Sequence, residues 1–519
     1  MQITFLGHAG FCVETSRSLI IMDPWLSPLG AFDSAWFQFP SNHHLAALVQ
    51  EKLQDPTRRK YIYISHEHKD HFDPPFLNSL VSRDFTFILP HFRRSALRDL
   101  LADYKCEGMI TCRDGQVVDL EDGYAQLFLD DSELDRDSTV LVHADGMTFL
   151  NMNDCKLHDQ LPKIKSEHGK IDVLAAQFSG ATWHPTCYEY SPEVYQTISK
   201  KKMISKFEAT AKAIEVVKPK MYLPSAGPCC FLDPILAHLN YEPINIFPRT
   251  YKVLDYLEKR LKRSHPVYAP ELMPGDVIDV DCAEMAYTVP NRVTEANVQQ
   301  YLSAYRARYE GLFNAHHNPA RNGHDGIFSR LKGELESKLS SFTLSERVDR
   351  NLYFHFREPY DTMLRVDFRR RQVDAVSEIS DSNYYSIAAP SWEIERVLNR
   401  RLTWEDFSLT FRMRLSRAPD VYQTLIQGFL LMEPEDLNHF CARLLSLESQ
   451  KERIIVEAGG SRYSCNRICP HQGGDLSEGW IEEDRYLVCA RHRWRYDLQS
   501  GGKSDASEDS IDAVALEPV

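Results

Sequence analysis

Long apolar runs are missing from this sequence of 519 residues: none comes close to the roughly 20 residues that a membrane-spanning helix needs. The first residues lack the basic stretch and the cleavage site of a secretory signal. The twelve cysteines are scattered rather than spaced as a disulfide framework. A formal net charge of −14 argues against a nucleic-acid partner, because a phosphate backbone requires a basic surface. We therefore expect a cytoplasmic protein that binds neither membranes nor nucleic acids.

Two short motifs near the end of the chain each pair a cysteine with a histidine. Cys469 is followed by His471, and after 17 intervening residues Cys489 is followed by His492. A Rieske 2Fe-2S cluster needs these ligands, since one of its irons binds two thiolates and the other binds two imidazoles. A structural zinc site of Cys2His2 type is the alternative, but there the histidines lie a few residues apart on one helix. The pairing therefore predicts a Rieske cluster.

A second group of metal-ligand residues lies near the start of the chain. Residues 61–64 read as a buried strand, which leads directly into His66, His68, Asp70 and His71. The pattern H-x-H-x-D-H is the signature of the metallo-β-lactamase fold, in which ligands at a strand end and the following turn converge on a metal cleft. A solvated histidine-rich turn is the alternative, and the apolar strand before the motif favours the metal site.

Other ligands are expected where this fold supplies them. Asp154 follows a strand-like run and is the candidate for a carboxylate that can bridge two metals. The histidine usual before that strand is missing, and Glu133 is the candidate replacement. The usual late histidine is missing too, because Ser225 stands at the corresponding strand end. Fewer nitrogen ligands favour non-haem iron with open positions over a dizinc hydrolase, and whether one or two irons bind stays open.

Two other histidines are weaker candidates for this site. His184, beside a proline, could complete it, but a lone histidine in that setting is more often structural. His8 is expected behind the ligands rather than among them.

Taken in order, these motifs resemble those of the CMP-N-acetylneuraminate hydroxylase family. The matching stretches are Gln2-Ile-Thr, Asp23-Pro-Trp-Leu26, the H-x-H-x-D-H run, Asp154-Cys155, Pro224-x-Ala-Gly227, Arg414-Leu-x-Arg417-x-Pro-Asp-x-Tyr422, Cys469-x-His-Gln-Gly-Gly474 and Cys489-x-x-His-x-Trp494. That family carries its Rieske domain at the N-terminus, whereas here it lies at the C-terminus, so the two parts are joined in swapped order. Glu133 also stands where the family has a histidine.

Three regions are predicted from these anchors. Residues 1–265 should form the αββα metallo-β-lactamase-like sandwich, residues 266–445 a mixed α/β helical extension or cap, and residues 446–519 a small all-β Rieske domain. The fold class is therefore multidomain α+β. In the middle region, residues 293–302 and 434–445 show helical patterns, and residues 351–356 and 364–368 resemble strands.

The two metal sites together predict an oxidoreductase, a Rieske-dependent monooxygenase or hydroxylase. The chain has no G-x-G-x-x-G fingerprint, so electrons would come from an external ferredoxin, reductase or small haem carrier. Iron in the cleft would use O2 to oxidise a C–H or N–H bond of a small polar substrate, anionic or similar to a sugar nucleotide. Arg412, Arg414 and Arg417 are candidates for holding an anionic group, or else form a solvated strand face.

Electron transfer requires the cluster to approach the cleft. We expect His471 or His492 to face a cleft, either in the same chain or in a neighbouring chain of a homo-oligomer. Two other classes of function stay open: a metal-dependent hydrolase with an accessory Rieske module, and an electron-transfer protein that reduces O2 or nitric oxide.

Overall fold

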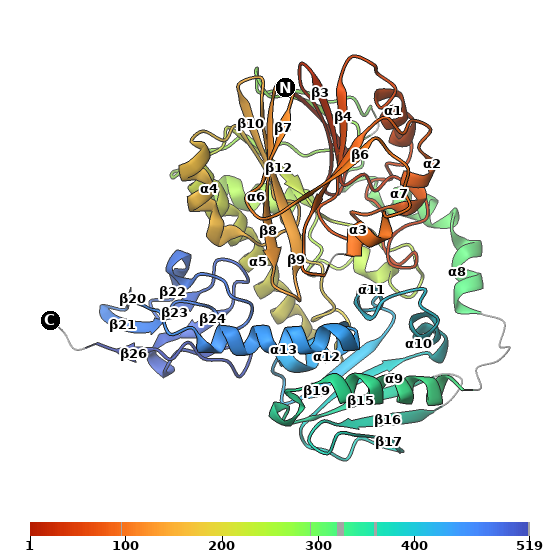
Figure 1. The fold of residues 1–519 in the computed structure, drawn as a ribbon, viewed down its shortest axis with the longest axis vertical. Coiled ribbons are helices and arrows are strands. Elements are labelled where there is room, and N and C mark those ends of the chain that lie inside the picture. The colour runs from red at the N-terminus through yellow and green to blue at the C-terminus, as the bar shows by residue number, and fades with distance from the viewer. Residues whose placement is uncertain (95, 291, 319–325, 358–360, 517–519) are drawn as a thin grey trace. The chain divides into compact units, whose positions relative to one another are not determined.

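The computed structural model describes residues 1–519 except 95, 291, 319–325, 358–360 and 517–519 (Figure 1). The chain forms two compact units, each described separately below. The first comprises Met1–Asp131, Asp135–Ala181 and Val194–His317, and the second comprises Ser132–Leu134, Thr182–Glu193 and Asn318–Val519. Residues 266–317 fall in the first unit, whereas the sequence grouped them with the middle region; the three predicted regions stay a prediction.

Two β-sheets form the centre of the first unit. The first sheet has eight strands, in the order β14 (Glu284–Ala286), β13 (Val277–Asp279), β1 (Gln2–Gly7), β2 (Gly10–Glu14), β3 (Ser18–Met22), β4 (Arg59–Tyr63), β5 (Thr86–Pro90) and β6 (Gly108–Cys112). The second has six, in the order β12 (Met221–Ser225), β11 (Val173–Gln177), β10 (Met147–Asn151), β9 (Arg136–Ala144), β8 (Gly123–Asp131) and β7 (Val117–Leu120).

Alternating side chains place both faces of each sheet in a core. In β3, Ile20 and Met22 join the core between the two sheets, while Leu19 and Ile21 face the helices on the other side. Successive side chains of a strand point to opposite faces, so a strand buried on both faces is apolar throughout. This explains why β3 reads as a continuous hydrophobic run, Ser-Leu-Ile-Ile-Met.

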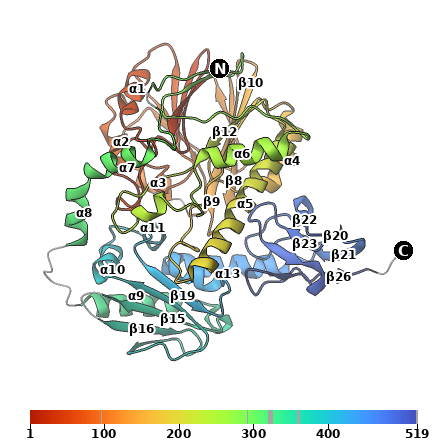
Figure 2. The ribbon, with the colours of Figure 1, turned by 180° about the vertical axis from the view of Figure 1, so that it is seen from behind.

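Helices cover the outer face of each sheet (Figures 1 and 2). On the first sheet these are α1 (Leu45–Lys52), α2 (Pro74–Ser79) and α3 (Ala96–Leu100). On the second they are α4 (Leu161–His168), α5 (Pro192–Val217) and α6 (Thr250–Leu261). The predicted αββα sandwich is confirmed. Helices α7 (Val298–Ala307) and α8 (Glu310–His317) complete the unit.

Helix α7 begins later than the pattern over residues 293–302 predicts. The Asn297 side chain accepts from the Thr294 amide (2.7 Å) and donates to the Arg292 carbonyl (3.0 Å). These bonds hold the preceding residues in a turn, so the helix starts at Val298.

The second unit contains a five-stranded sheet covered by helices. The strand order is β17 (Gln372–Val376), β16 (Thr362–Asp367), β15 (Asn351–Phe356), β18 (Tyr384–Ala389) and β19 (Arg414–Ala418). The helices are α9 (Ile327–Ser341), α10 (Ser391–Leu398), α11 (Trp404–Leu409), α12 (Thr424–Leu431) and α13 (Pro434–Ser449). The predicted strand at 351–356 matches β15, and the helical pattern from 434 is the first part of α13.

Two small antiparallel sheets form the C-terminal part of the second unit. One contains β20 (Arg453–Ala458), β21 (Ser461–Asn466) and β26 (Val514–Ala515). The other contains β22 (Trp480–Glu482), β23 (Tyr486–Val488), β24 (Arg495–Asp497) and β25 (Lys503–Ser504). This part is all-β, as predicted. Among the described residues, no helix is both long and apolar enough to cross a bilayer.

Candidate metal centres

The H-x-H-x-D-H run occupies the turn after β4. Asp23, just beyond β3, accepts hydrogen bonds from the amide (2.8 Å) and the hydroxyl (2.7 Å) of Ser65, which precedes the run. The His68 carbonyl accepts from the amides of His71 (3.0 Å) and Phe72 (2.7 Å) and closes the turn. Because β3 and β4 are parallel, their carboxyl ends lie at the same edge of the sheet, where the polar side chains gather.

One group of ligand atoms consists of His66, His71 and Asp154, and all three side chains are largely buried. Asp154 Oδ1 lies 3.5 Å from His71 Nε2 and 4.0 Å from His66 Nδ1. His68 Nδ1 lies 2.8 Å from His66 Nε2. Asp154 comes three residues after β10, so the two sheets supply this group jointly.

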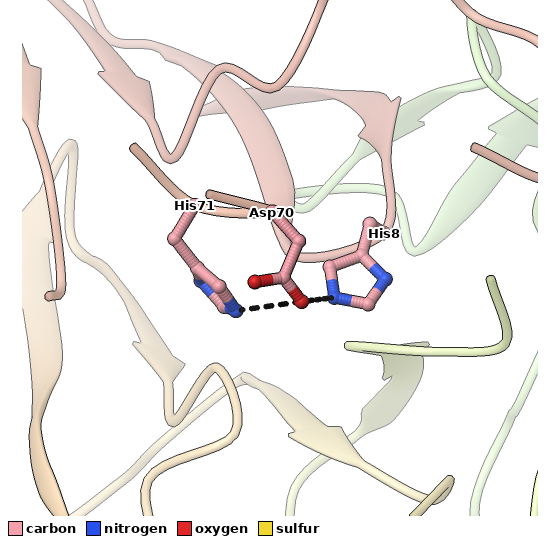
Figure 3. Close-up of side chains that lie close together, drawn as sticks. All are labelled: His8, Asp70 and His71. Atoms are coloured by element: carbon pink, nitrogen blue, oxygen red, sulfur yellow. Dashed lines mark ion pairs between the residues drawn. The ribbon is translucent and has the colours of Figure 1, made fainter. Parts of the chain in front are cut away.

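A second group consists of His8, Asp70 and His71 (Figure 3). Asp70 Oδ2 lies 3.1 Å from His8 Nε2 and 3.8 Å from His71 Nε2. His8 follows β1 directly and is buried. His71 is thus common to both groups.

Two further carboxylates lie beside these imidazoles. Asp23 Oδ2 lies 2.8 Å from His71 Nδ1, and both side chains are fully buried. Asp137 Oδ1 lies 3.1 Å from His66 Nδ1, the same nitrogen that faces Asp154. We infer from this network that His71 carries its proton on Nδ1, which leaves Nε2 for a metal. A carboxylate behind a ligating histidine commonly fixes its tautomer and its ring orientation in this way.

Buried charges set the protonation of the cleft. Burial alone would lower the pKa of His71, but the carboxylates of Asp154, Asp70 and Asp23 outweigh it and hold that pKa well above its ordinary value. Burial would raise the pKa of Asp154, yet His71 and His66 hold it well below the usual range. Burial and the neighbouring His71 lower the pKa of His66, which favours the neutral form that binds metals. A cation in this cleft would therefore replace a proton.

Several buried ligand atoms have no hydrogen-bond partner among the described residues: His8 Nδ1, Asp70 Oδ1, His71 Nε2 and Asp154 Oδ1. Buried polar atoms in native proteins are almost always hydrogen-bonded, so a group of orphaned atoms calls for an explanation. Imidazole nitrogens and carboxylate oxygens are the donors that first-row transition metals accept. The residues of this cleft therefore fit a metal.

The structure brings together five of the six cleft residues named from the sequence, namely His66, His68, Asp70, His71 and Asp154. Glu133 is in neither group: it belongs to the short segment Ser132–Leu134 of the second unit, where Ser132 Oγ donates to Gln472 Oε1 (2.8 Å). Its role as a ligand stays a prediction. Ser225 does end β12, as predicted.

Two residues of the cleft, Asp23 and Asp137, were missed from the sequence: Asp23 supports the His71 imidazole, and Asp137 lies beside His66. His8, expected behind the ligands, belongs to one of the two groups, with its Nε2 3.1 Å from Asp70 Oδ2, and its role stays a prediction. Asp23 had a local signal, since an acidic residue after a buried strand and before a proline ends at the same sheet edge as the motif. Asp137 had no comparable signal, because it lies inside β9.

The four cysteine and histidine residues of the C-terminal motifs lie in two loops of the second unit, after β21 and after β23. All four are buried, both cysteines completely. The backbone of each loop turns tightly: the Gly473 amide donates to the Cys469 carbonyl (2.9 Å), and the Arg493 amide donates to the Cys489 carbonyl (2.8 Å). The loops therefore present the two motifs in the same way, which suits one cluster held between them.

Packing around the sulfur atoms fits a cluster. A Cβ added at Gly474 would lie 2.8 Å from Cys489 Sγ, so this position has no room for a side chain. The Trp494 ring stacks on the His471 ring, with centroids 3.9 Å apart and planes 16° apart. Burial would raise the pKa of Cys469, but hydrogen bonds from Cys489, Tyr496 and the amides of His471 and Gln472 lower it. The hydrogen bond to Cys469 and burial raise the pKa of Cys489, so the site without iron stabilises negative charge on one of the two sulfur atoms, that of Cys469.

Two of the other predicted polar residues, His184 and Arg417, belong to one polar cluster of the second unit, whereas Arg414 is exposed and Arg412 is buried. Arg417 pairs with Asp420 (2.7 Å) and lies over the Tyr188 ring, 4.9 Å from its centroid. His184 Nε2 lies 3.0 Å from the Tyr190 hydroxyl, which donates to Asp420 (2.8 Å). Arg417 is therefore engaged within the protein.

These two sites define the class of protein. Residues 2–226 match the model of a β-lactamase superfamily domain, and residues 430–511 match the model of a Rieske [2Fe-2S] domain. The chain is a metallo-β-lactamase-fold domain followed by a Rieske domain, as the sequence motifs predicted.

Homologous proteins align with most of this chain. A protein of Mycobacterium tuberculosis, described only as a Rieske 2Fe-2S iron–sulfur protein, is 28% identical over 96% of this chain and 97% of its own. The cytidine monophosphate-N-acetylneuraminic acid hydroxylase of Pongo pygmaeus is 23% identical over 88% of this chain and 77% of its own. The predicted relationship to that hydroxylase is confirmed.

Among solved structures, CmlA, a diiron β-hydroxylase from Streptomyces venezuelae, is 14% identical and covers 53% of each chain with a TM-score of 0.38. At this score the likeness supports no argument about the present chain.

The hydroxyl of Tyr496, which lies 3.1 Å from Cys469 Sγ, should tune the cluster. Its hydrogen bond stabilises the reduced cluster, which carries more negative charge on sulfur. Tyr496→Phe should therefore lower the reduction potential by roughly 20–60 mV, the equivalent of one ordinary hydrogen bond. A redox titration followed by electron paramagnetic resonance (EPR) measures the shift. Tyr463→Phe, in the same core, is the control; equal shifts in both variants would contradict the assignment.

The Asp23 carboxylate should govern metal affinity without contacting the metal. Asp23→Asn removes the charge that orients His71, and such supporting carboxylates are typically worth about 10–100-fold in metal affinity. Competition with a chelator measures this loss. Asp55→Asn changes an exposed carboxylate bonded to Thr57 and serves as the control. Unchanged affinity in Asp23→Asn would show that Asp23 only closes the turn.

Proposed function

We propose that this protein is a Rieske-dependent non-haem iron oxygenase that hydroxylates or N-oxygenates a small polar substrate. The observation that carries the proposal is the presence, in one chain, of a Rieske domain and of a buried cleft of imidazoles and carboxylates with orphaned ligand atoms. A hydrolase needs no electron-transfer domain, and a protein that reduces O2 or nitric oxide needs no cavity for an organic substrate. The homologous hydroxylase supports the same reading.

The two cofactors would have distinct tasks. When bound, the cluster supplies single electrons and the cleft iron supplies the activation of dioxygen. Cys469, Cys489, His471 and His492 would hold the cluster. His66, His68, His71 and Asp154 would hold iron, while Asp23 keeps the His71 imidazole in position.

An external donor is part of this proposal. Among the described residues, the buried loops around Cys469 and Cys489 provide for a cluster, and the sequence contains no dinucleotide fingerprint for a flavin or nicotinamide cofactor. A ferredoxin, a reductase or a small haem carrier would supply the electrons. Transfer from His471 or His492 to a cleft, in the same chain or in a second copy, stays a prediction.

A cavity of about 480 Å³ in the first unit is the candidate substrate site. Arg249 and Lys252 bring positive charge to its wall, and the Arg249 guanidinium lies 4.9 Å from the centroid of the Phe39 ring. Glu295 partly offsets that charge at 3.3 Å from Arg249. Burial, Cys230 and then the Asp70 carboxylate raise the pKa of Cys229, which lines the cavity. Aromatic and cationic groups together suit a planar, anionic substrate.

The first test concerns His68 and does not require the substrate. His68→Ala should leave the cluster intact, yet slow its reoxidation by O2 more than about 100-fold, because losing a ligand costs more than losing an outer carboxylate. The protein is reduced chemically, mixed with O2, and the cluster absorbance is followed by stopped-flow. His143→Ala, a histidine bonded to Thr148, is the control. Equal reoxidation rates, or a cleft that holds only zinc in native protein, would favour the hydrolase class.

The second test concerns the cavity. Arg249→Gln should weaken binding of CMP-N-acetylneuraminate about tenfold, the effect of one charged contact, with no change in metal content. Calorimetric titration of the metal-loaded protein measures the change, and Lys259→Gln on the exposed side of α6 is the control. If wild-type protein bound neither CMP-N-acetylneuraminate nor CMP, a cytidine sugar nucleotide would be excluded as substrate.

A further inference from the structure

We propose that His8 is a metal ligand and that the cleft binds two metal ions, with His8 supplying the nitrogen that Ser225 cannot. The proposal concerns the same cleft as the proposed oxygenase but does not depend on its chemistry, because it holds for any divalent metal bound there.

Distances within the second group suit one metal ion. Asp70 Oδ2 lies 3.1 Å from His8 Nε2 and 3.8 Å from His71 Nε2 (Figure 3). A metal about 2.1 Å from each ligand places adjacent ligands roughly 3.0 Å apart in octahedral and 3.4 Å apart in tetrahedral geometry. The three side chains converge from two elements, His8 from the turn after β1 and the others from the turn after β4.

The backbone places His8 beside the end of β12, where the fold would otherwise supply a late histidine. The Ala226 amide, next to Ser225, donates to the His8 carbonyl (2.9 Å). Ser225 is completely buried, and its hydroxyl has no hydrogen-bond partner among the described residues. A hydroxyl is a poor ligand for a transition metal, so Ser225 does not replace an imidazole. His8 therefore brings an imidazole to the part of the cleft beside the end of β12, where Ser225 stands in place of the late histidine.

The turn of Gly7 and His8 after β1 has an uncommon backbone conformation, which neighbouring side chains hold in place. Gly7 has φ +106°, a conformation that favours glycine, and His8 has φ +50°, which is uncommon for a residue with a side chain. A Cβ at Gly7 would lie 2.9 Å from both Asn42 Nδ2 and Gln38 Oε1, so these two side chains would have to move. Asn42 in turn donates to the Leu6 carbonyl (2.7 Å). Strain maintained in this way is typical of a functional position, and here it directs the His8 ring toward Asp70.

Other surroundings of His8 do not explain its position. Trp25 packs edge-on to the ring, with centroids 5.5 Å apart, and supplies an apolar contact only. His8 Nδ1 has no hydrogen-bond partner in the described part of the chain. The simpler alternative is that His8 only donates a hydrogen bond to Asp70, and the test must separate this role from ligation.

The division of ligands between two ions follows from these contacts. His66, His68 and Asp154 would hold one ion, and His8, Asp70 and His71 the other. Asp154 Oδ1 lies 3.5 Å from His71 Nε2, so this carboxylate stands between the two positions and can bridge them.

His8→Gln is the decisive variant, because a glutamine amide can still donate to Asp70 but is a weak ligand. After anaerobic loading of the full chain with Fe(II), metal analysis should find one iron fewer per chain in His8→Gln than in wild type. Loading the zinc-free protein with Zn(II) should show the same difference. After each loaded protein is then exposed to O2, which oxidises the cleft iron to Fe(III), the two ferric ions of wild type should be magnetically coupled and EPR-silent, whereas the variant should show an isolated high-spin ferric ion. His143→Gln should match wild type in all three measurements.

A second variant tests whether the second metal site can be restored by another histidine. Ser225→His in the His8→Gln background should recover the second metal, since it returns a histidine to the end of β12. Full metal content in His8→Gln would overturn the proposal and leave His8 as a hydrogen-bond donor. One metal beyond the cluster in wild type would also overturn it, and this count needs no variant to fold. Loss of oxygenase activity with the metal count as expected would instead refute the proposed function alone.

Discussion

The buried hydrogen bonds of Asp23 are the interaction on which the metal cleft depends. This one carboxylate lies just beyond β3 and accepts hydrogen bonds from the Ser65 amide, the Ser65 hydroxyl and His71 Nδ1. It therefore connects the end of β3 to the turn that follows β4. A buried carboxylate is tolerated only if its oxygens are fully bonded. Because Asp23 is satisfied in this way, His71 can turn Nε2 toward Asp70 and Asp154, and both candidate metal positions share that imidazole.

The Rieske site depends on a different constraint, which is close packing around two sulfur atoms. Gly474 leaves no space for a side chain beside Cys489, and Trp494 covers one face of His471. The donors to Cys469 come from the backbone of its own loop and from Tyr496. Short loops on small antiparallel sheets can form such a site with few residues, because most of its contacts are local.

The two sites differ in how they treat charge, and that difference suits a division of tasks. The cleft collects carboxylates around imidazoles and attracts a cation in exchange for a proton. The sulfur site uses neutral hydrogen-bond donors, which support negative charge without adding positive charge. The chain thus combines a site suited to an iron–sulfur cluster with a site suited to a metal cation.

The sequence by itself determined the ligand motifs, the strands before His66 and before Asp154, and the αββα class, since these depend on neighbouring residues and on a period of two along a strand. It also placed Ser225 at the end of β12 and the strand β15 correctly. Only the tertiary structure decided that His8 joins Asp70, that Asp23 supports His71 and Asp137 lies beside His66, and that Glu133 lies in the segment beside Gln472. His8, Asp23 and Asp137 each meet partners more than 40 residues away in sequence, and no local pattern records a contact of that range.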